Sequence, residues 1–403
     1  GPRRSILSGR LKKATEAMKS AGVRRANEKQ LLRLIHDSGT VTQAEMAAQT
    51  GLQASTVFRI FRSLEERGLV RQVPGHLPEE PRQGRRPGFY ELNPGAAYSL
   101  GIDLAHRGSA ILLVDFTGSV VGQRGLDFPA HVSGQDVVTL LLAGIRDVVD
   151  GAQVNHDDLL GVGIGAPGVV DIAEGRIVKY ARQPGMEGLS LRHEIEQALG
   201  VPVHLQNNAS VIALAENRFG RAAGHESVVA YLIRTGVGGA FVKEGRLYTS
   251  QGLTAFEVGH TTLNKLRDDP TVPGETLEDI LCEDALIQRV HNVDRSVSDL
   301  SSLVECMASE SSPACRALEP VAQAFYEHVR NVALMLNPEA FLIISRRSAI
   351  AEFFATQLSL KFDQQEGGDR YNVSTVLPLE YDPILACRGA ADLVFDHYFA
   401  VSE

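Results

Sequence analysis

The side chains best suited to chemistry lie in the stretch 234–260, which reads RTGVGGAFVKEGRLYTSQGLTAFEVGH. Gly236, Gly238 and Gly239 follow a predicted strand, and glycines at positive φ would let backbone N–H groups approach an anion closely. Glu257 and His260 come soon after, and a carboxylate with an imidazole can bind the hydroxyl groups of a polar ligand. Taken alone, the stretch fits a plain β-hairpin with a surface carboxylate and a packed histidine equally well. The rest of the chain must decide between these interpretations.

A second stretch, residues 27–72, has the pattern of a helix-turn-helix. Four apolar residues predict a first helix that Ser38-Gly39 ends: Leu31, Leu32, Leu34 and Ile35. Thr42 with Glu45 three residues later predicts the capping box of a short second helix, and Gly51-Leu52 predicts the turn after it. A third helix is expected to open at Ala54 or Ser55 and to end at Gly68, with one apolar face: Val57, Ile60, Phe61 and Leu64.

In a helix-turn-helix, the start of the third helix points toward the major groove of DNA, here with Gln53, Ser55, Thr56 and Arg59. Residues 69–73 and 88–92 predict the two strands of a wing. The loop between them, LPEEPRQGRRPG, could lay Arg85 and Arg86 along a narrow A·T-rich minor groove or only against phosphates. The alternative is a small helical bundle that binds no nucleic acid, but the turn, the wing and the local charge favour DNA binding.

Charge is divided unevenly along the chain. The net charge is −9, yet residues 1–90 contain 17 Lys and Arg against 8 Asp and Glu, whereas the remainder contains 23 against 41. A basic module on an acidic body favours a polyanionic partner. A solvated basic tail would explain residues 1–25 as well, and a frayed helix over residues 6–18 is compatible with either interpretation.

Length and composition predict a soluble globular protein of two or three domains, since 403 residues exceed a single core and hydrophobic residues make up 44%. No apolar run approaches the roughly 20 residues of a membrane span. The four cysteines, Cys282, Cys306, Cys315 and Cys387, lack metal-binding spacing, which predicts free thiols in a cytoplasmic protein.

After Asn93-Pro94-Gly95, strands and helices alternate, which predicts an α/β body. Strands are expected as a hairpin over residues 98–115 and at 120–124, 159–165, 201–205 and 341–344. Helices are expected at about 135–150, 191–199, 208–216, 317–336 and 385–399. The last helix contains Gly389-Ala390-Ala391 for close packing and should return to the first lobe of the body. No internal repeat is visible in the sequence.

With these elements in order, the chain resembles the ROK family, the repressors, open reading frames and kinases of sugar metabolism, and within it the sugar repressors of the xylose and N-acetylglucosamine type. The resemblance covers nearly everything after residue 25. It rests on the helix-turn-helix with its wing, GRRP, GIDLAHRGSAILLVD, GIGAPGVVD, the NNAS stretch before ALAE, TGVGGAFVKEGRLY and FEVGH. It implies two lobes of ribonuclease-H-like (actin/hexokinase-like) α/β fold with a hexose in the cleft. The family's repressors carry the DNA-binding module and its kinases lack it.

The chain departs from the family's kinases at three places. Their Asp-x-Gly-Gly-Thr phosphate turn is replaced by Asp103-Leu104-Ala105-His106-Arg107, whose side chains would obstruct ATP. Their catalytic Asp is replaced by Asn208, and an amide cannot accept the proton of a sugar hydroxyl. Their Gly-Gly after an Asn-Pro-Glu segment is replaced near Ser345-Arg346. These losses predict a protein without catalytic residues that is not an enzyme.

The resemblance implies that one sugar contacts five residues: Asn207, Asn208, Glu257, His260 and Glu278. It also implies a structural zinc, which the family holds with the histidine of Gly-His and three cysteines. Here His260 remains, but no cysteine follows it before Cys282. We therefore expect neither a metal site nor a cofactor.

We expect residues 1–92 to form a winged helix-turn-helix domain and residues 93–403 an effector-binding domain. Its first lobe would comprise about 93–209 with the helix at 385–403, and its second lobe about 210–384. The predicted function is sugar-controlled repression of carbohydrate-metabolism genes. The predicted state is a homodimer or dimer of dimers on double-stranded operator DNA, in the bacterial cytoplasm and nucleoid and away from membranes. Two alternatives stay open: a bifunctional ATP-dependent sugar kinase with a DNA-binding domain, and an interaction protein that senses a phosphocarrier partner.

Overall fold

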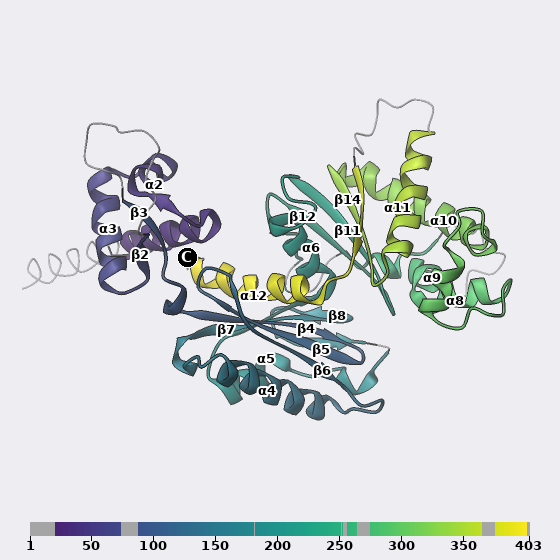
Figure 1. Ribbon diagram of the computed structural model, residues 1–403, viewed down its shortest axis with the longest axis horizontal. Coiled ribbons are helices and arrows are strands. Elements are labelled where there is room, and N and C mark those ends of the chain that lie inside the picture. Colours follow the sequence, from purple (N-terminus) through teal and green to yellow (C-terminus); the bar gives the residue numbers. More distant parts are fainter. Residues whose placement is uncertain are drawn as a thin grey trace, which may run out of the picture.

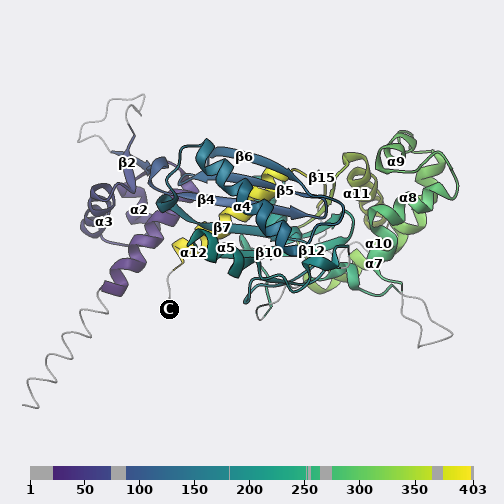
Figure 2. The same ribbon diagram turned by 90° about the horizontal axis from the view of Figure 1, so that it is seen from below.

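The computed structural model describes residues 21–73, 88–180, 182–250, 252, 256–263, 275–364 and 375–400. These residues form a small N-terminal module and a body of two lobes, and helix α12 (Pro383–Phe399) runs from the lobes toward the module (Figures 1 and 2). The helix predicted for residues 6–18 lies outside the described residues. Within the described ranges, no helix combines the length and the apolar character that crossing a membrane requires.

The N-terminal module is a helix-turn-helix with a wing. A helix over residues 21–38 is followed by α2 (Gln43–Thr50) and α3 (Ala54–Glu66), and β1 (Val41–Thr42), β2 (Val70–Gln72) and β3 (Phe89–Leu92) form an antiparallel sheet of order β1-β3-β2. The predicted capping box is present. The hydroxyl of Thr42 accepts a hydrogen bond from the backbone N–H of Glu45 at 3.2 Å, and the carboxylate of Glu45 accepts one from the backbone N–H of Thr42 at 2.7 Å. All four apolar residues predicted to form the inner face of α3 are buried.

Lobe one contains a five-stranded sheet of order β10-β7-β4-β5-β6. Its strands are β4 (Tyr98–Ala105), β5 (Gly108–Asp115), β6 (Val120–Asp127), β7 (Leu159–Ala166) and β10 (Val203–Asn207). β4, β5 and β6 are antiparallel neighbours, whereas β7 pairs in parallel with β4 and with β10. α4 (Gly134–Gly151) and α5 (Leu191–Leu199) cover one face of this sheet (Figure 1), and the hairpin of β8 (Val169–Asp171) and β9 (Arg176–Lys179) follows β7.

Lobe two repeats this arrangement in a sheet of order β13-β12-β11-β14-β15. Its strands are β11 (Ser227–Ile233), β12 (Val237–Lys243), β13 (Arg246–Leu247), β14 (Ala340–Ser345) and β15 (Thr375–Glu380). Antiparallel and parallel pairs fall at the same places as in lobe one. One apolar core joins this sheet to five helices: α7 (Leu277–Leu281), α8 (Glu283–His291), α9 (Leu300–Cys306), α10 (Pro313–Leu336) and α11 (Ser348–Asp363).

Two helices lie between the sheets. α6 (Asn208–Phe219) packs on β11 and β12, while α12 packs on β4 and β7 and against α6. Glycine allows α12 to lie directly on its sheet, because a Cβ on Gly101 or Gly163 would stand 1.9 or 1.8 Å from a carbonyl oxygen of the helix. The last helix therefore rests on the sheet of lobe one.

The end of α12 also attaches the module to the body. One apolar core contains Leu31 and Ile35 of the helix over residues 21–38, Phe116 after β5, and Phe395 and Phe399 of α12. Within it, the imidazole of His36 lies 4.5 Å from the ring of Phe395, centroid to centroid. The module is thus packed against lobe one through side chains and is not held by its linker alone.

Candidate functional site

A cavity of about 670 Å³ lies between the lobes, at the ends of β4, β10 and β11 and the start of α6. Its lining includes all five residues that the sequence predicted to contact a sugar: Asn207, Asn208, Glu257, His260 and Glu278. Its volume lies within the range of small-molecule sites.

Two of these residues come from the junction of β10 and α6. Asn207 is the N-cap of α6, since its Oδ1 accepts from the backbone N–H of Ala209 at 2.9 Å, and its Nδ2 donates to the carbonyl of Gly168 at 2.8 Å. The amide of Asn207 is therefore engaged in holding the helix in place. Asn208 is the first residue of α6, is half-buried and lines the cavity.

The other three residues come from lobe two. Glu257 is half-buried and His260 is exposed, and both lie at a short 3₁₀ turn, Val258–His260. Glu278 stands at the start of α7, and its Oε2 accepts from the backbone N–H of Val237 at 2.9 Å.

The glycine-rich turn lines the cavity, but its backbone differs from the one that its sequence suggested. The expectation of positive φ is wrong, because Gly236, Gly238 and Gly239 all have ordinary backbone angles. Glycine is needed here for close packing: a Cβ on Gly236 would lie 2.8 Å from Oε2 of Glu278, and a Cβ on Gly239 would lie 2.5 Å from the side chain of Val258. The absence of side chains therefore lets the turn approach Glu278 and Val258 closely, while Gly236 and Gly238 also line the cavity.

A contact between the lobes, centred on Asp103 at the end of β4, closes one part of the cavity. Asp103 is 2% exposed; its Oδ2 accepts from the hydroxyl of Tyr381 and lies 3.9 Å from Nη1 of Arg234. The guanidinium of Arg234 lies 4.5 Å from the centroid of the Tyr381 ring. Oδ1 of Asp103 is buried and has no hydrogen-bond partner within the described part of the chain, although Asp103 is among the residues that line the cavity.

Five cationic side chains line the cavity: Arg107, Lys179, Arg182, Arg234 and Arg346. Arg182 pairs with Asp284 at 2.6 Å and Arg346 with Glu283 at 2.8 Å. Burial, assisted by the charges of Arg107 and Arg182, lowers the pKa of His106, which keeps this imidazole neutral near pH 7. His106 meets the ring of Tyr180 edge-on at 6.5 Å between centroids, so its side chain stands in the cavity.

A structural zinc at His260 would need further His, Cys, Asp or Glu side chains gathered around it. In the described ranges, no group of three or more His, Cys, Asp or Glu side chains is arranged to hold a metal.

The outer face of α3 is a second candidate site. Ser55, Phe58, Arg59 and Arg62 are exposed, and their spacing places them on one stripe of the helix. Gln53, the N-cap of α3, is exposed at the start of this stripe.

The remaining predicted DNA contacts are placed less favourably or not described. Thr56 is half-buried, and its hydroxyl is 3.5 Å from Nη2 of Arg59. Arg85 and Arg86 lie outside the described residues.

Phe58 was missed by the sequence prediction. Its ring is 55% exposed, whereas Phe61 in the same helix is fully buried. The signal was present in the periodicity, because Phe58 falls outside the apolar face formed by Val57, Ile60, Phe61 and Leu64. An apolar side chain on such a stripe can contact the methyl group of thymine.

Comparison with known proteins matches both parts of the chain. The profile of the ROK family matches residues 99–394, and the profile of the IclR helix-turn-helix domain matches residues 30–74. A xylose repressor of Caldicellulosiruptor bescii is 26% identical over 359 residues, which cover 85% of this chain and 88% of that protein. An N-acetylglucosamine repressor of Escherichia coli is 24% identical over 331 residues, 80% of either chain.

Solved structures show the same fold. A ROK family transcriptional regulator, described as a homologue of the E. coli Mlc protein, superimposes with a TM-score of 0.77 at 19% identity, over 94% of this chain and 97% of its own. A ROK family glucokinase from Streptomyces griseus, in complex with glucose and AMPPNP, superimposes with a TM-score of 0.62 at 21% identity, over 74% and 99%. The predicted fold class is confirmed.

The pH dependence of stability tests the placement of Asp103. Burial, opposed by Arg234, raises the pKa of this carboxyl group to about 6, whereas an Asp of an unfolded chain titrates at about 3.9. The folded state therefore binds the proton more tightly, and the contribution of Asp103 to stability falls as the pH rises between about 4 and 6. Asp103→Asn cannot ionise, so over this window its unfolding free energy should gain roughly 3 kcal/mol relative to wild type. Urea unfolding at several pH values measures the difference, and parallel profiles would contradict the buried placement.

Proposed function

Because this chain belongs to the ROK family, we propose that it is a DNA-binding repressor of carbohydrate-metabolism genes whose operator affinity is set by a sugar or sugar derivative in the cavity between its lobes. The proposal rests on the combination of two parts in one chain. The first is an IclR-type helix-turn-helix with an exposed stripe on α3. The second is a ROK body whose cavity is lined by the five residues expected to contact a sugar. The relatives named for repression by xylose and N-acetylglucosamine support this class of effector.

The cavity offers a sugar both acceptors and donors. The carboxylates of Glu257 and Glu278 accept hydrogen bonds from hydroxyl groups, and the amide of Asn208 can donate and accept. A hydroxyl donating to Oδ1 of Asp103 would satisfy a buried atom that otherwise lacks a partner. Ligand binding would thereby stabilise the arrangement of the two lobes around it.

We further propose that this site does not transfer phosphate. His106 and Arg234 place side chains beside the glycine-rich turn, and that turn packs on Glu278 and Val258. Asn208 supplies an amide where a sugar kinase needs a base. Incubating the full chain with γ-labelled ATP and a panel of sugars tests the alternative of a bifunctional kinase, because transfer of label to any sugar would contradict the proposal.

We place the protein on the nucleoid in the cytoplasm, as a homodimer or a dimer of dimers. Two copies of α3 related by a two-fold axis would enter successive major grooves. The operator is then a pseudo-palindrome whose half-sites are separated by whole helical turns.

Arg59→Ala should reduce sequence specificity. A lost contact to a base edge costs about 1–3 kcal/mol, or about 5- to 150-fold in affinity for an operator selected from a random DNA library, with little change on unrelated DNA. Arg124→Ala removes an exposed arginine of the body, paired with Asp147, and serves as the matched control. Arg85→Ala and Arg86→Ala should lower affinity for sites with A·T-rich flanks. If Arg59→Ala, Arg85→Ala and Arg86→Ala all leave operator binding intact, the proposed DNA-contacting elements are misplaced.

Phe58→Ala should weaken operator binding only where thymine carries its methyl group. Replacing thymine by uracil in the selected operator removes that methyl and should weaken the wild type, because an apolar contact is lost. The variant, which has no ring to make the contact, should bind both operators alike. Fluorescence anisotropy with the two DNAs measures this, and an equal loss on uracil DNA for wild type and variant would exclude the contact.

Glu257→Ala should abolish the response to sugar, because the carboxylate lines the cavity. DNA binding without sugar should stay intact, because Glu257 belongs to lobe two and α3 to the N-terminal module. The measurement is operator affinity with and without each member of a sugar panel. The wild type should respond to at least one member by about 5- to 150-fold, which corresponds to about 1–3 kcal/mol of coupling. If the variant responds to sugar like the wild type, the effector does not bind at Glu257 and its site lies elsewhere.

A further inference from the structure

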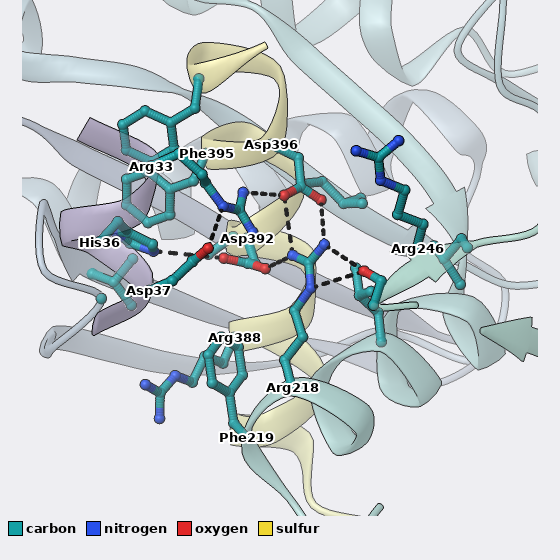
Figure 3. Close-up of a pocket in the computed structure, with 18 of the residues that line it drawn as sticks. Arg33, His36, Asp37, Arg218, Phe219, Arg246, Arg388, Asp392, Phe395 and Asp396 are labelled. Atoms are coloured by element: carbon teal, nitrogen blue, oxygen red, sulfur yellow. Dashed lines mark hydrogen bonds and ion pairs between the residues drawn. The ribbon is translucent and has the colours of Figure 1, made fainter. Parts of the chain in front are cut away.

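A second cavity, of about 1160 Å³, lies where the DNA-binding module meets both lobes (Figure 3). Its lining comes from the helix over residues 21–38, from α6, from the turn between β12 and β13, and from α12. The four arginines in the lining are matched by four carboxylates, so no excess charge favours an ionic ligand: Arg33, Arg218, Arg246 and Arg388 against Asp37, Glu244, Asp392 and Asp396. The ion pairs themselves are the notable feature of this cavity.

The carboxylate of Asp396 on α12 is shared by two parts of the molecule. Arg33 of the DNA-binding module donates to Oδ1 of Asp396, and Arg218 of α6 donates to its two oxygens at 3.1 and 3.0 Å. Figure 3 shows the two guanidinium groups on either side of this carboxylate. Because the side chain of Arg218 is 15% exposed and that of Asp396 is 29% exposed, solvent screens this pairing less than it screens surface ion pairs.

Arg218 also holds a buried acid and part of lobe two. It donates to Oδ2 of Asp392, whose side chain is 4% exposed. Its Nε and Nη2 donate to the carbonyl of Gly245, in the turn between β12 and β13, at 3.3 and 2.9 Å. His36 lies 3.8 Å from Asp392, but burial lowers the pKa of His36, so Arg218 is the main cation that compensates this acid near pH 7.

Three rigid elements connect this cluster to the sugar cavity. α6 runs about 18 Å from Asn208 in the cavity to its last turn, which carries Arg218. β12 starts at Val237 in the cavity and ends next to Gly245. α12 starts just after Tyr381, which binds Asp103, and carries Asp396 in its last turn. A change at the cavity therefore has direct mechanical routes to both sides of the shared carboxylate.

We propose that Arg218 and Asp396 are the positioning residues that transmit the state of the sugar cavity to the DNA-binding module. When the separation of the lobes changes, Arg218 moves with α6 and the β12–β13 turn, and Asp396 passes the displacement to Arg33. The inference rests on the proposed function in that operator binding is its physiological output. Packed elements with two discrete arrangements can carry such coupling.

A double-mutant cycle on the full chain tests this without any sugar. Tyr381→Phe removes the hydroxyl that donates to Asp103, at the cavity end of the connection, and keeps the ring that contacts Arg234. In the wild-type background it should change the dissociation constant of the selected operator by about five-fold or more. In an Arg218→Gln background the same substitution should change it by less than about two-fold, because the connection is cut.

Arg388→Gln is the matched control, since Arg388 lines the same cavity but lies over the ring of Phe219, at 4.4 Å from its centroid, and makes no ion pair within the described part of the chain. The five-fold effect of Tyr381→Phe should persist in this background. Asp396→Asn replaces Arg218→Gln if the latter variant does not fold, because it keeps the shape of the side chain. It should reduce the effect of Tyr381→Phe on operator binding in the same way. Equal effects of Tyr381→Phe in the Arg218→Gln and wild-type backgrounds would overturn the proposal.

Hydrogen exchange of residues 21–38 makes the test independent of DNA. Tyr381→Phe should alter the protection of this helix in the wild-type and Arg388→Gln backgrounds but not in Arg218→Gln. Unaltered protection in the wild-type background would overturn the proposal even if operator binding were lost for other reasons. A wild-type chain that selects no DNA sequence but shows the expected exchange pattern would instead contradict the proposed repressor function.

Discussion

The close packing of α12 between the two sheets is the constraint on which the rest of the structure depends. Gly101 and Gly163 allow the helix backbone to rest directly on β4 and β7, and its other side meets α6. Its start follows Tyr381 at the cavity between the lobes, and its end contributes Phe395 and Phe399 to the core of the DNA-binding module. Since interiors at this density cannot deform continuously, one helix fixes the module relative to the cavity. Under the proposed function, regulation then requires a second contact that can change, and we propose the ion pairs of Arg218 for this contact.

We propose that the cavity between the lobes acts as a receptor for a sugar and not as a kinase site. Gly236 and Gly239 lie close to Glu278 and Val258, and the side chains of His106 and Arg234 line the same cavity. Asp103 is drawn into a contact with Arg234 and Tyr381, where burial raises the pKa of its carboxyl group to about 6. What remains is a polar pocket rich in hydroxyl-binding groups. Such a pocket can use its binding energy to select one arrangement of the lobes rather than to accelerate a reaction.

Local signals predicted local structure well. The Thr42–Glu45 capping box, the apolar face of α3 and the bounds of α5 at residues 191–199 all follow from short-range patterns. The five cavity residues were named together only through the family resemblance, because they come from separate elements. The shared topology of the two sheets depends on pairing between distant strands and leaves no repeat in the sequence. The contact of Arg33 with Asp396 joins residues 363 positions apart, which no local pattern could indicate. β10 begins two residues later than predicted, after Pro202, which has no N–H to donate to a strand ladder.

The central claim is that a sugar bound between the lobes, without being phosphorylated, shifts the affinity of the module for its operator. Linkage makes this reciprocal, so sugar affinity must differ by the same factor between the free protein and its operator complex. Titration calorimetry of neutral sugars, sugar acids, amino sugars and polyols into both forms is the most direct measurement. We expect at least one ligand whose two dissociation constants differ by about 5- to 150-fold. Equal constants for every ligand that binds, or no binding by any of them, would contradict it.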